Sequence, residues 1–181
     1  KIAILGQPTT VKEFVDVARM QFWGEEYNKG VEEFNRYRTS NSDDKDIVLE
    51  KAINTFITAS AIKPDEARTY SMLSTSYFFA GDAVETLKNI LKAVELSPED
   101  ANINLTAGQI FMQKQEFEQA LPYVKKAVEL DPSNTKSIRN LAQIYYDTGD
   151  MEKSIETYED AISKETDRKI KADLYFNLGI L

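Results

Sequence analysis

The segment ANINLTAGQIFMQKQEFEQALPYVKKAVELDPSN, residues 101–134, contains a pattern that recurs along the chain. Its ending, E-L-D-P at residues 129–132, matches E-L-S-P at residues 95–98, which lies 34 residues earlier. Pro64 precedes the proline of E-L-S-P by the same interval. A fixed interval of this length is typical of an array in which one supersecondary unit is repeated.

Frames of this length that end two residues past the proline position span residues 67–100, 101–134 and 135–168, and a further frame opens at residue 172. Across the frames, position 8 is small, position 11 is aromatic and position 27 is alanine. The residues concerned are Ser74, Gly108, Ala142 and Gly179 at position 8, Tyr77, Phe111 and Tyr145 at position 11, and Ala59, Ala93, Ala127 and Ala161 at position 27. Small residues beside aromatic ones indicate helices that pack closely against one another.

Turn signals divide each frame into two helices. Gly81 and Gly149, at position 15, can adopt the left-handed conformation that ends a first helix. Asp82 followed by Glu85 predicts a capping box at the start of the second helix. The prolines at position 32 push the preceding residue out of the helical region, and this ends the second helix. One helix pair cannot bury its own apolar face, so stacked pairs are expected to share a core.

These positions resemble the tetratricopeptide repeat, a helix-turn-helix unit with small residues near positions 8, 20 and 27 and proline at position 32. The resemblance covers roughly residues 45–181, with departures at Asn104 (position 4), Thr86 and Ser154 (position 20) and Thr166 (position 32). It implies an all-α fold, a right-handed helix-turn-helix repeat solenoid like the superhelix of that family. About eight helices and no sheet are expected.

The N-terminal third is less regular. Thr10 and Glu13 predict a capping box, and apolar residues follow at near-helical spacing from Val11 to Phe34. One helix over about 11–38, a polar loop over 39–44 and a second helix from Asp46 to Pro64 account for this stretch. We interpret residues 10–66 as a degenerate first helix pair, residues 1–9 as an extended lead-in, and residues 172–181 as the start of a truncated repeat.

The composition excludes several classes of function. The 181 residues are 42% hydrophobic and 29% charged, with 22 basic and 30 acidic side chains, a net charge of −8 and neither cysteine nor histidine. Disulfides, thiolate zinc sites and histidine-based catalytic triads are therefore excluded. An acidic chain without a basic cluster argues against nucleic acid and against an anionic membrane surface as partners. The apolar runs are only a few residues long, so no direct insertion into a membrane is expected. A soluble protein is expected, and the compartment stays open between cytoplasm, periplasm and the extracellular space.

No motif in the chain indicates catalysis or a cofactor. The oxygen-rich run at residues 40–46 lacks the spacing of a calcium loop, and no glycine-rich phosphate loop is present. We therefore expect no enzyme activity, no cofactor and no metal site.

The resemblance implies a binding groove lined by the first helices of successive repeats, at positions 2, 5, 6, 9, 12 and 13. Further residues at these positions, beside those predicted to form the groove, include Gln113, Asp173 and Phe176. The residues predicted to form the groove are Arg68, Thr75, Phe78, Gln109, Met112, Lys136, Arg139, Asn140, Gln143, Tyr146 and Asn177. The chaperone-tail carboxylate clamp of related repeats needs lysine at position 5 and asparagine at position 9, and no frame has this pair.

The predicted function is a noncatalytic protein–protein interaction scaffold that binds an extended, acidic segment of a partner protein. The alternative is a structural repeat module that associates with other copies of itself. The last frame stops at Leu181, so a second helix that would cover Leu174, Tyr175, Leu178 and Leu181 is missing from it. We expect either that the native chain continues or that this partial repeat pairs with another copy.

Overall fold

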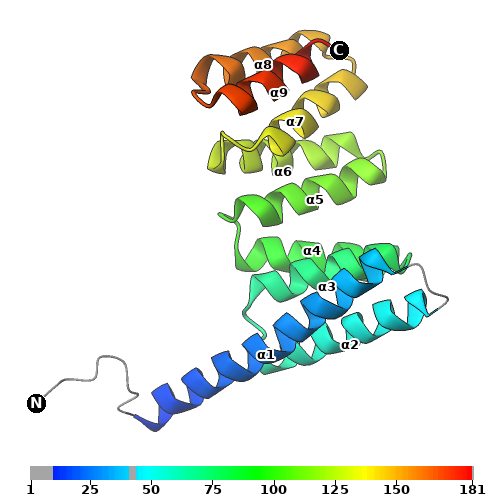
Figure 1. Ribbon diagram of the computed structural model, residues 1–181, viewed down its shortest axis with the longest axis vertical. Helices are drawn as coiled ribbons and strands as arrows, with labels where there is room; N and C mark the ends of the chain where they lie inside the picture. Colours follow the sequence, from blue (N-terminus) through cyan, green and yellow to red (C-terminus); the bar gives the residue numbers. More distant parts are fainter. Residues whose placement is uncertain (1–9, 41–43, 181) are drawn as a thin grey trace, which may run out of the picture. The chain divides into compact units, whose positions relative to one another are not determined.

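The computed structural model describes residues 10–40 and 44–180, and every regular element in this part of the chain is a helix (Figure 1). The described helices are α1 (Val11–Thr39), α2 (Lys45–Ile62), α3 (Ala67–Phe79), α4 (Ala83–Leu96), α5 (Ala101–Gln113), α6 (Phe117–Leu130), α7 (Thr135–Asp147), α8 (Met151–Lys164) and α9 (Arg168–Leu178). The predicted all-α class is confirmed, with one helix more than the eight of four complete pairs. The predicted lead-in at residues 1–9 lies outside the described residues.

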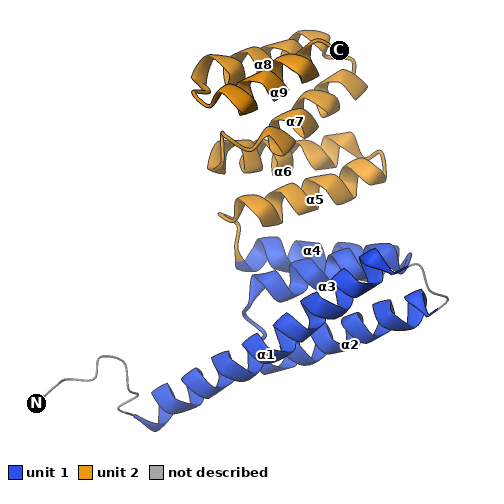
Figure 2. Ribbon diagram, viewed as in Figure 1, with its two compact units in different colours: residues 1–96 blue, residues 97–181 orange. Residues whose placement is uncertain are grey.

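The chain divides into two compact units, residues 1–96 and residues 97–181 (Figure 2). Unit 1 contains α1 to α4, and unit 2 contains α5 to α9. Within each unit every helix packs on the next one, and α1 also contacts α3, α5 contacts α7, and α7 contacts α9. Contacts between near neighbours in the sequence are those expected of stacked helix pairs.

Left-handed residues end the first helices, as predicted. Gly81 has φ 78° and Gly149 has φ 85°. Gln115, between α5 and α6, has φ 60° at the equivalent place although it carries a side chain. Glycine therefore lowers the conformational free energy of this left-handed turn in two repeats, and the third repeat forms the same turn without glycine.

Side-chain oxygens cap the helix starts. The capping box of Thr10 and Glu13 is present in both directions at the start of α1. Asp100, Asn134 and Asp167 each accept hydrogen bonds from two backbone N–H groups of α5, α7 and α9, respectively. Each cap satisfies donors that the helix itself cannot satisfy, so local sequence determines where these three helices begin.

Serine occupies two small positions of the repeat, Ser74 at position 8 and Ser154 at position 20, and the second of these is a departure from the pattern. Ser74 Oγ donates a hydrogen bond to the carbonyl oxygen of Thr86 at 2.7 Å, and Ser154 Oγ donates to that of Ala142 at 2.9 Å. Both serines are completely buried. A hydroxyl in either small position thus links the two helices of a pair without leaving a buried polar atom unpaired.

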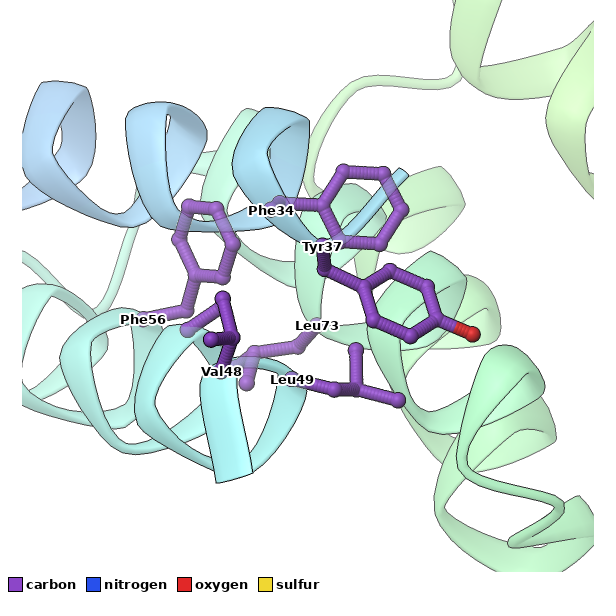
Figure 3. Packing of buried hydrophobic residues seen from close by; sticks show 7 residues of the cluster. Phe34, Tyr37, Val48, Leu49, Phe56 and Leu73 are labelled. Atoms are coloured by element: carbon purple, nitrogen blue, oxygen red, sulfur yellow. The ribbon is translucent and has the colours of Figure 1, made fainter. Parts of the chain in front are cut away.

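The core of unit 1 is formed by large side chains from three helices (Figure 3). Phe34 and Tyr37 of α1 pack against residues of α2 and against Leu73 of α3. Phe56 of α2 lies directly against Gly30 of α1, where an added Cβ would come within 2.6 Å of its ring. The small position of the degenerate first repeat therefore receives an aromatic ring.

The first three turns of α1 differ from the sequence-based expectation. Their apolar residues were expected to continue the stripe that ends at Phe34, but Val11, Phe14 and Phe22 are exposed and Trp23 is the first buried residue. The end of α2 lies beside Trp23, because the Lys63 ammonium group stands 5.9 Å from the Trp23 ring. Residues 11–22 therefore extend past the helix that would have covered them.

Candidate functional site

Two hollows in unit 2 are lined by the first helices of successive pairs. The hollow between α5 and α7 has a volume of about 540 Å³. Gln109, Met112 and Gln113 of α5 line one side, and Lys136 and Asn140 of α7 line the other. Amide groups therefore lie on both sides of this hollow, and amides can both donate and accept hydrogen bonds.

The hollow between α7 and α9 has a volume of about 400 Å³. Its lining residues are Thr135, Lys136, Arg139, Asp173, Phe176 and Asn177. Lys136 lines both hollows, so the two are adjacent along α7. Six predicted groove residues are thereby brought together, namely Gln109, Met112, Lys136, Arg139, Asn140 and Asn177.

The two cations of this region have no acidic partner. In the part of the chain that the structure describes, no ion pair includes Lys136 or Arg139. Burial raises the pKa of the Tyr158 hydroxyl, and the nearby positive charge of Arg139 partly offsets this rise. Both cations are exposed, and both remain available to an anionic group of a ligand.

Asn140 carries an unsatisfied donor. Its amide nitrogen Nδ2 is buried, and no acceptor among residues 10–40 and 44–180 receives its hydrogens. A buried donor without a partner costs about 1–3 kcal/mol.

The other candidates on α7 do not line the two hollows. Gln143 is exposed and donates a hydrogen bond to Asp147 at 3.0 Å. Tyr146 is exposed one turn further along the helix. Sequence reasoning missed Thr135, whose only signal is its place after the cap residue Asn134.

The remaining three candidates lie on α3 of unit 1. The Arg68 guanidinium donates to the Glu66 carboxylate at 2.9 Å. Thr75 Oγ1 donates to the carbonyl oxygen of Ser71 at 2.9 Å. The Phe78 ring meets the Phe79 ring edge to face, with 5.7 Å between centroids.

Arg68 belongs to a charged cluster beside the Trp23 ring. Its guanidinium stands 5.2 Å from the ring centroid, and Lys63 also donates to Glu66 at 3.0 Å. Burial is the strongest single influence on the pKa of Glu66 and raises it. The hydrogen bonds and charges of Arg68 and Lys63 together outweigh burial, so the pKa of Glu66 lies below its ordinary value.

Replacing Glu66 by glutamine is expected to lower the stability of unit 1 at pH 7 by about 1–2 kcal/mol. Because the folded-state pKa is lowered, the carboxylate stabilises the fold above the unfolded pKa of about 4.3, and this contribution disappears as the pH falls through the folded value. The difference between wild type and variant should therefore shrink as the pH falls below about 5 and disappear below the folded-state pKa. Urea unfolding followed by Trp23 fluorescence measures this difference.

Glu95→Gln is the matched control, since Lys92 is the one ion-pair partner of this exposed carboxylate among the described residues. Its effect should stay within about 0.5 kcal/mol. A Glu66→Gln effect that is independent of pH would contradict the role assigned to the carboxylate charge.

The described part of the chain offers neither a metal site nor a membrane-spanning helix. Among residues 10–40 and 44–180, no three acidic side chains come close enough together to hold a metal ion. The oxygen-rich run at residues 40–46 lies only partly within this range. No helix in the described part of the chain is both long enough and apolar enough to cross a bilayer.

Solved structures with the same fold share little sequence with this chain. A MamA structure matches with a TM-score of 0.62 and 22% identity, covering 78% of this chain and 82% of that one. PilF of Pseudomonas aeruginosa matches with a TM-score of 0.69 and 16% identity, covering 88% and 70%, respectively. The first TPR of Spaghetti (RPAP3), bound to the HSP90 peptide SRMEEVD, matches with a TM-score of 0.60 and 17% identity, covering 70% and 92%. At these identities, the likeness concerns the fold.

Family models match the sequence itself. A comparison with curated proteins finds none that matches. Two tetratricopeptide repeat models match residues 79–135 and residues 111–174. Their limits differ from the frames at 67–100, 101–134 and 135–168, so the division into those frames stays a prediction. Together the two matches span more than half of the 181 residues, and the chain belongs to the tetratricopeptide repeat family.

Proposed function

We propose that this chain is a noncatalytic scaffold that binds an extended segment of a partner protein along α5, α7 and α9. The observation that carries the proposal is the pair of adjacent hollows that share Lys136. An extended peptide presents backbone donors and acceptors at regular intervals, and Gln109, Asn140 and Asn177 supply amides to pair with them. The related TPR of Spaghetti is bound to a peptide, which supports this class of ligand.

The charges favour a segment that carries carboxylates. Lys136 and Arg139 are three residues apart on α7, so their side chains lie on neighbouring turns of one helix face. Both line the α7/α9 hollow and neither has an ion-pair partner among the described residues. Asp173 lines the α9 side of this hollow, and its negative charge would repel an acidic group of the ligand on that side. We therefore place the carboxylate of the ligand nearer to α7 than to α9.

The double variant Arg139→Ala, Asn140→Ala is expected to weaken partner binding at least tenfold. It removes one charge-assisted hydrogen bond and one amide contact, together worth about 1.5–3 kcal/mol. A crosslinked pull-down identifies the partner, and a synthetic peptide of its crosslinked segment is titrated against both proteins by calorimetry. Wild-type affinity should also fall as salt rises, because both cations are exposed.

Gln119→Ala, Lys125→Ala is the matched control, since it removes an amide and a cation from exposed positions on α6. The control should bind like wild type. Unchanged affinity of the Arg139, Asn140 variant, with its helical circular dichroism intact, would remove the binding site from these hollows.

A second candidate is self-association through α9. Of the residues predicted to lack cover, Tyr175 is exposed, whereas Leu174 is buried in the core of unit 2 and the prediction for it is wrong. Phe176 and Ile180 are exposed beside Tyr175, and such side chains in a group often mark an interface. Phe176 also lines the α7/α9 hollow, where a peptide would cover it. If α9 pairs with another copy, Phe176→Glu should abolish any concentration-dependent increase in mass seen by sedimentation.

A further inference from the structure

The first three turns of α1 carry an uncovered apolar stripe. We define the α1 stripe as Val11, Phe14, Val15, Ala18 and Phe22. Val11 is 82% exposed, Phe14 65%, Val15 45% and Phe22 57%. In Figure 1, this part of α1 extends past the end of α2.

The α1 stripe points in a different direction from the core-facing residues of the same helix. From Trp23 onward, α1 buries Trp23, Gly30, Phe34 and Tyr37 against unit 1. At 100° per residue, the centre of the α1 stripe is rotated by roughly a third of a turn from that direction.

Charged residues occupy the core-facing direction over the first three turns. Lys12, Asp16 and Arg19 lie there, and all three are exposed. The sequence thus changes its apolar face between Phe22 and Trp23. The α1 stripe is therefore a separate surface and not an extension of the core.

The spacing of the α1 stripe is that of a coiled-coil seam. Val11, Val15, Ala18 and Phe22 are four, three and four residues apart, which is the a and d pattern of a heptad. Phe14 flanks the seam. Such a seam is built to meet another helix along its length, and in the described part of unit 1 no helix covers it.

The area of the stripe suits a weak dimer. Taking about 150–250 Å² for a whole aromatic side chain, the exposed parts of the two phenylalanines and two valines amount to roughly 400–500 Å². Two copies would bury roughly twice this area, and flanking side chains bring the total near the lower limit of about 1,200 Å² for specific interfaces. The stripe is also comparable with the largest apolar patches of typical monomers, which are often functional.

The charges beside the α1 stripe favour a second copy of this chain as its partner over a strongly charged protein surface. Residues 11–22 carry two basic and two acidic side chains, Lys12, Arg19, Glu13 and Asp16, so this segment has no net charge. A neutral helix gains nothing from a basic or acidic partner surface, whereas another copy supplies a seam of the same length and spacing.

We propose that this chain forms a dimer in which the α1 stripes of two copies pair as a short parallel coiled coil. In an antiparallel pairing with Val11 facing Phe22 of the second copy, Lys12 would lie beside Arg19 of that copy and the two would repel. In the parallel pairing, Arg19 lies beside Phe14 of the second copy, whose ring face attracts a cation. This interface lies in unit 1 and is independent of the hollows in unit 2.

Sedimentation equilibrium of the full chain tests the dimer. The apparent mass should rise from 20.6 kDa towards twice that value as the concentration increases from about 5 µM to about 500 µM. Val15→Glu, Phe22→Glu should abolish this rise, since it places charges in the seam. Met20→Glu is the matched control, because Met20 is also exposed on these turns but lies on the opposite side of the helix from the stripe. It should leave the rise unchanged, and Trp23 fluorescence verifies that unit 1 stays folded in each variant.

Several results would overturn the proposal. They are a constant mass of 20.6 kDa at the highest concentration, loss of association in Met20→Glu as well, or association that persists in the seam variant. If association persists in Val15→Glu, Phe22→Glu and is lost in Phe176→Glu, the chain associates through α9 and not through the α1 stripe.

A disulfide tests the register. The chain contains no cysteine, so Ala18→Cys introduces a single thiol. In the parallel pairing, residue 18 faces its own counterpart, and mild oxidation should yield a crosslinked dimer, whereas Met20→Cys should stay largely monomeric. Equal crosslinking of the two variants would contradict the parallel seam.

Discussion

Replacing Phe56 by alanine is expected to lower the free energy of unfolding of unit 1 by about 3–5 kcal/mol. The Phe56 side chain is completely buried, and its ring centroid lies 5.9 Å from that of Tyr27. The ring also lies against Gly30, which has no side chain that could move into the space left by the ring. The variant therefore loses the buried apolar area and also retains most of the cavity, which is the costliest combination for a large-to-small substitution.

The single tryptophan makes this measurement specific to unit 1. Trp23 is buried, and its Nε1 donates a hydrogen bond to Thr69 of α3 at 2.8 Å, so its fluorescence reports unfolding of that unit. Ile57→Ala is the control, because Ile57 is the neighbouring residue on α2 and is exposed. It should cost less than about 1 kcal/mol. If Phe56→Ala costs no more than this control, the packing of α2 on α1 described above is wrong.

The same glycine-to-alanine substitution is expected to have opposite effects at two positions. Gly24 lies within α1 with no atom near the place of an added Cβ, so alanine should stabilise the helix by about 0.5–1 kcal/mol. At Gly108, the added Cβ would overlap Val124 Cγ2 on α6. Val124 is completely buried and cannot move away freely, so Gly108→Ala should destabilise unit 2 by about 1–3 kcal/mol despite its better helix propensity.

A double-mutant cycle identifies the cause at Gly108. Val124→Ala alone should be destabilising because it opens a cavity, but combined with Gly108→Ala it removes the overlap. The double variant should therefore be more stable than the sum of the two single effects by at least about 1 kcal/mol. Unit 2 contains no tryptophan, so amide hydrogen exchange in α5 and α6 is the appropriate measurement. Additive effects would show that α5 and α6 do not meet at this position.

Most of the helix boundaries could be predicted because they depend on local chemistry. The capping box of Thr10 and Glu13 and the left-handed glycines Gly81 and Gly149 are where the sequence places them. Asp82 also accepts hydrogen bonds from two N–H groups of α4, but Glu85 pairs with Lys88 instead of closing the capping box. Because Glu85 has more than one possible partner within reach, the spacing of the residues does not predict which one it pairs with.

The candidate site could be predicted less completely. The family positions identified nine of the residues that line the two hollows of unit 2, and they missed only Thr135. They also identified Gln143 and Tyr146, which do not line them. Arg68 falls at a groove position but is held by Glu66 and lies over the Trp23 ring. The position within a repeat indicates a helix face, whereas the partner of a long charged side chain depends on which residues from other helices come near it.

The sequence by itself determined the all-α class, the 34-residue period and the ends of most helices, since periodicity, capping and backbone stereochemistry act within a few residues of chain. Tertiary structure alone decided that residues 11–22 of α1 are largely exposed, that Lys136 lines both hollows and that the Asn140 donor finds no acceptor among the described residues. The physical reason is that burial and hydrogen-bond partners depend on where neighbouring helices begin and end. The sequence shows that the apolar face of α1 changes between Phe22 and Trp23, and the end of α2 beside Trp23 decides that the second part is buried and the first is exposed.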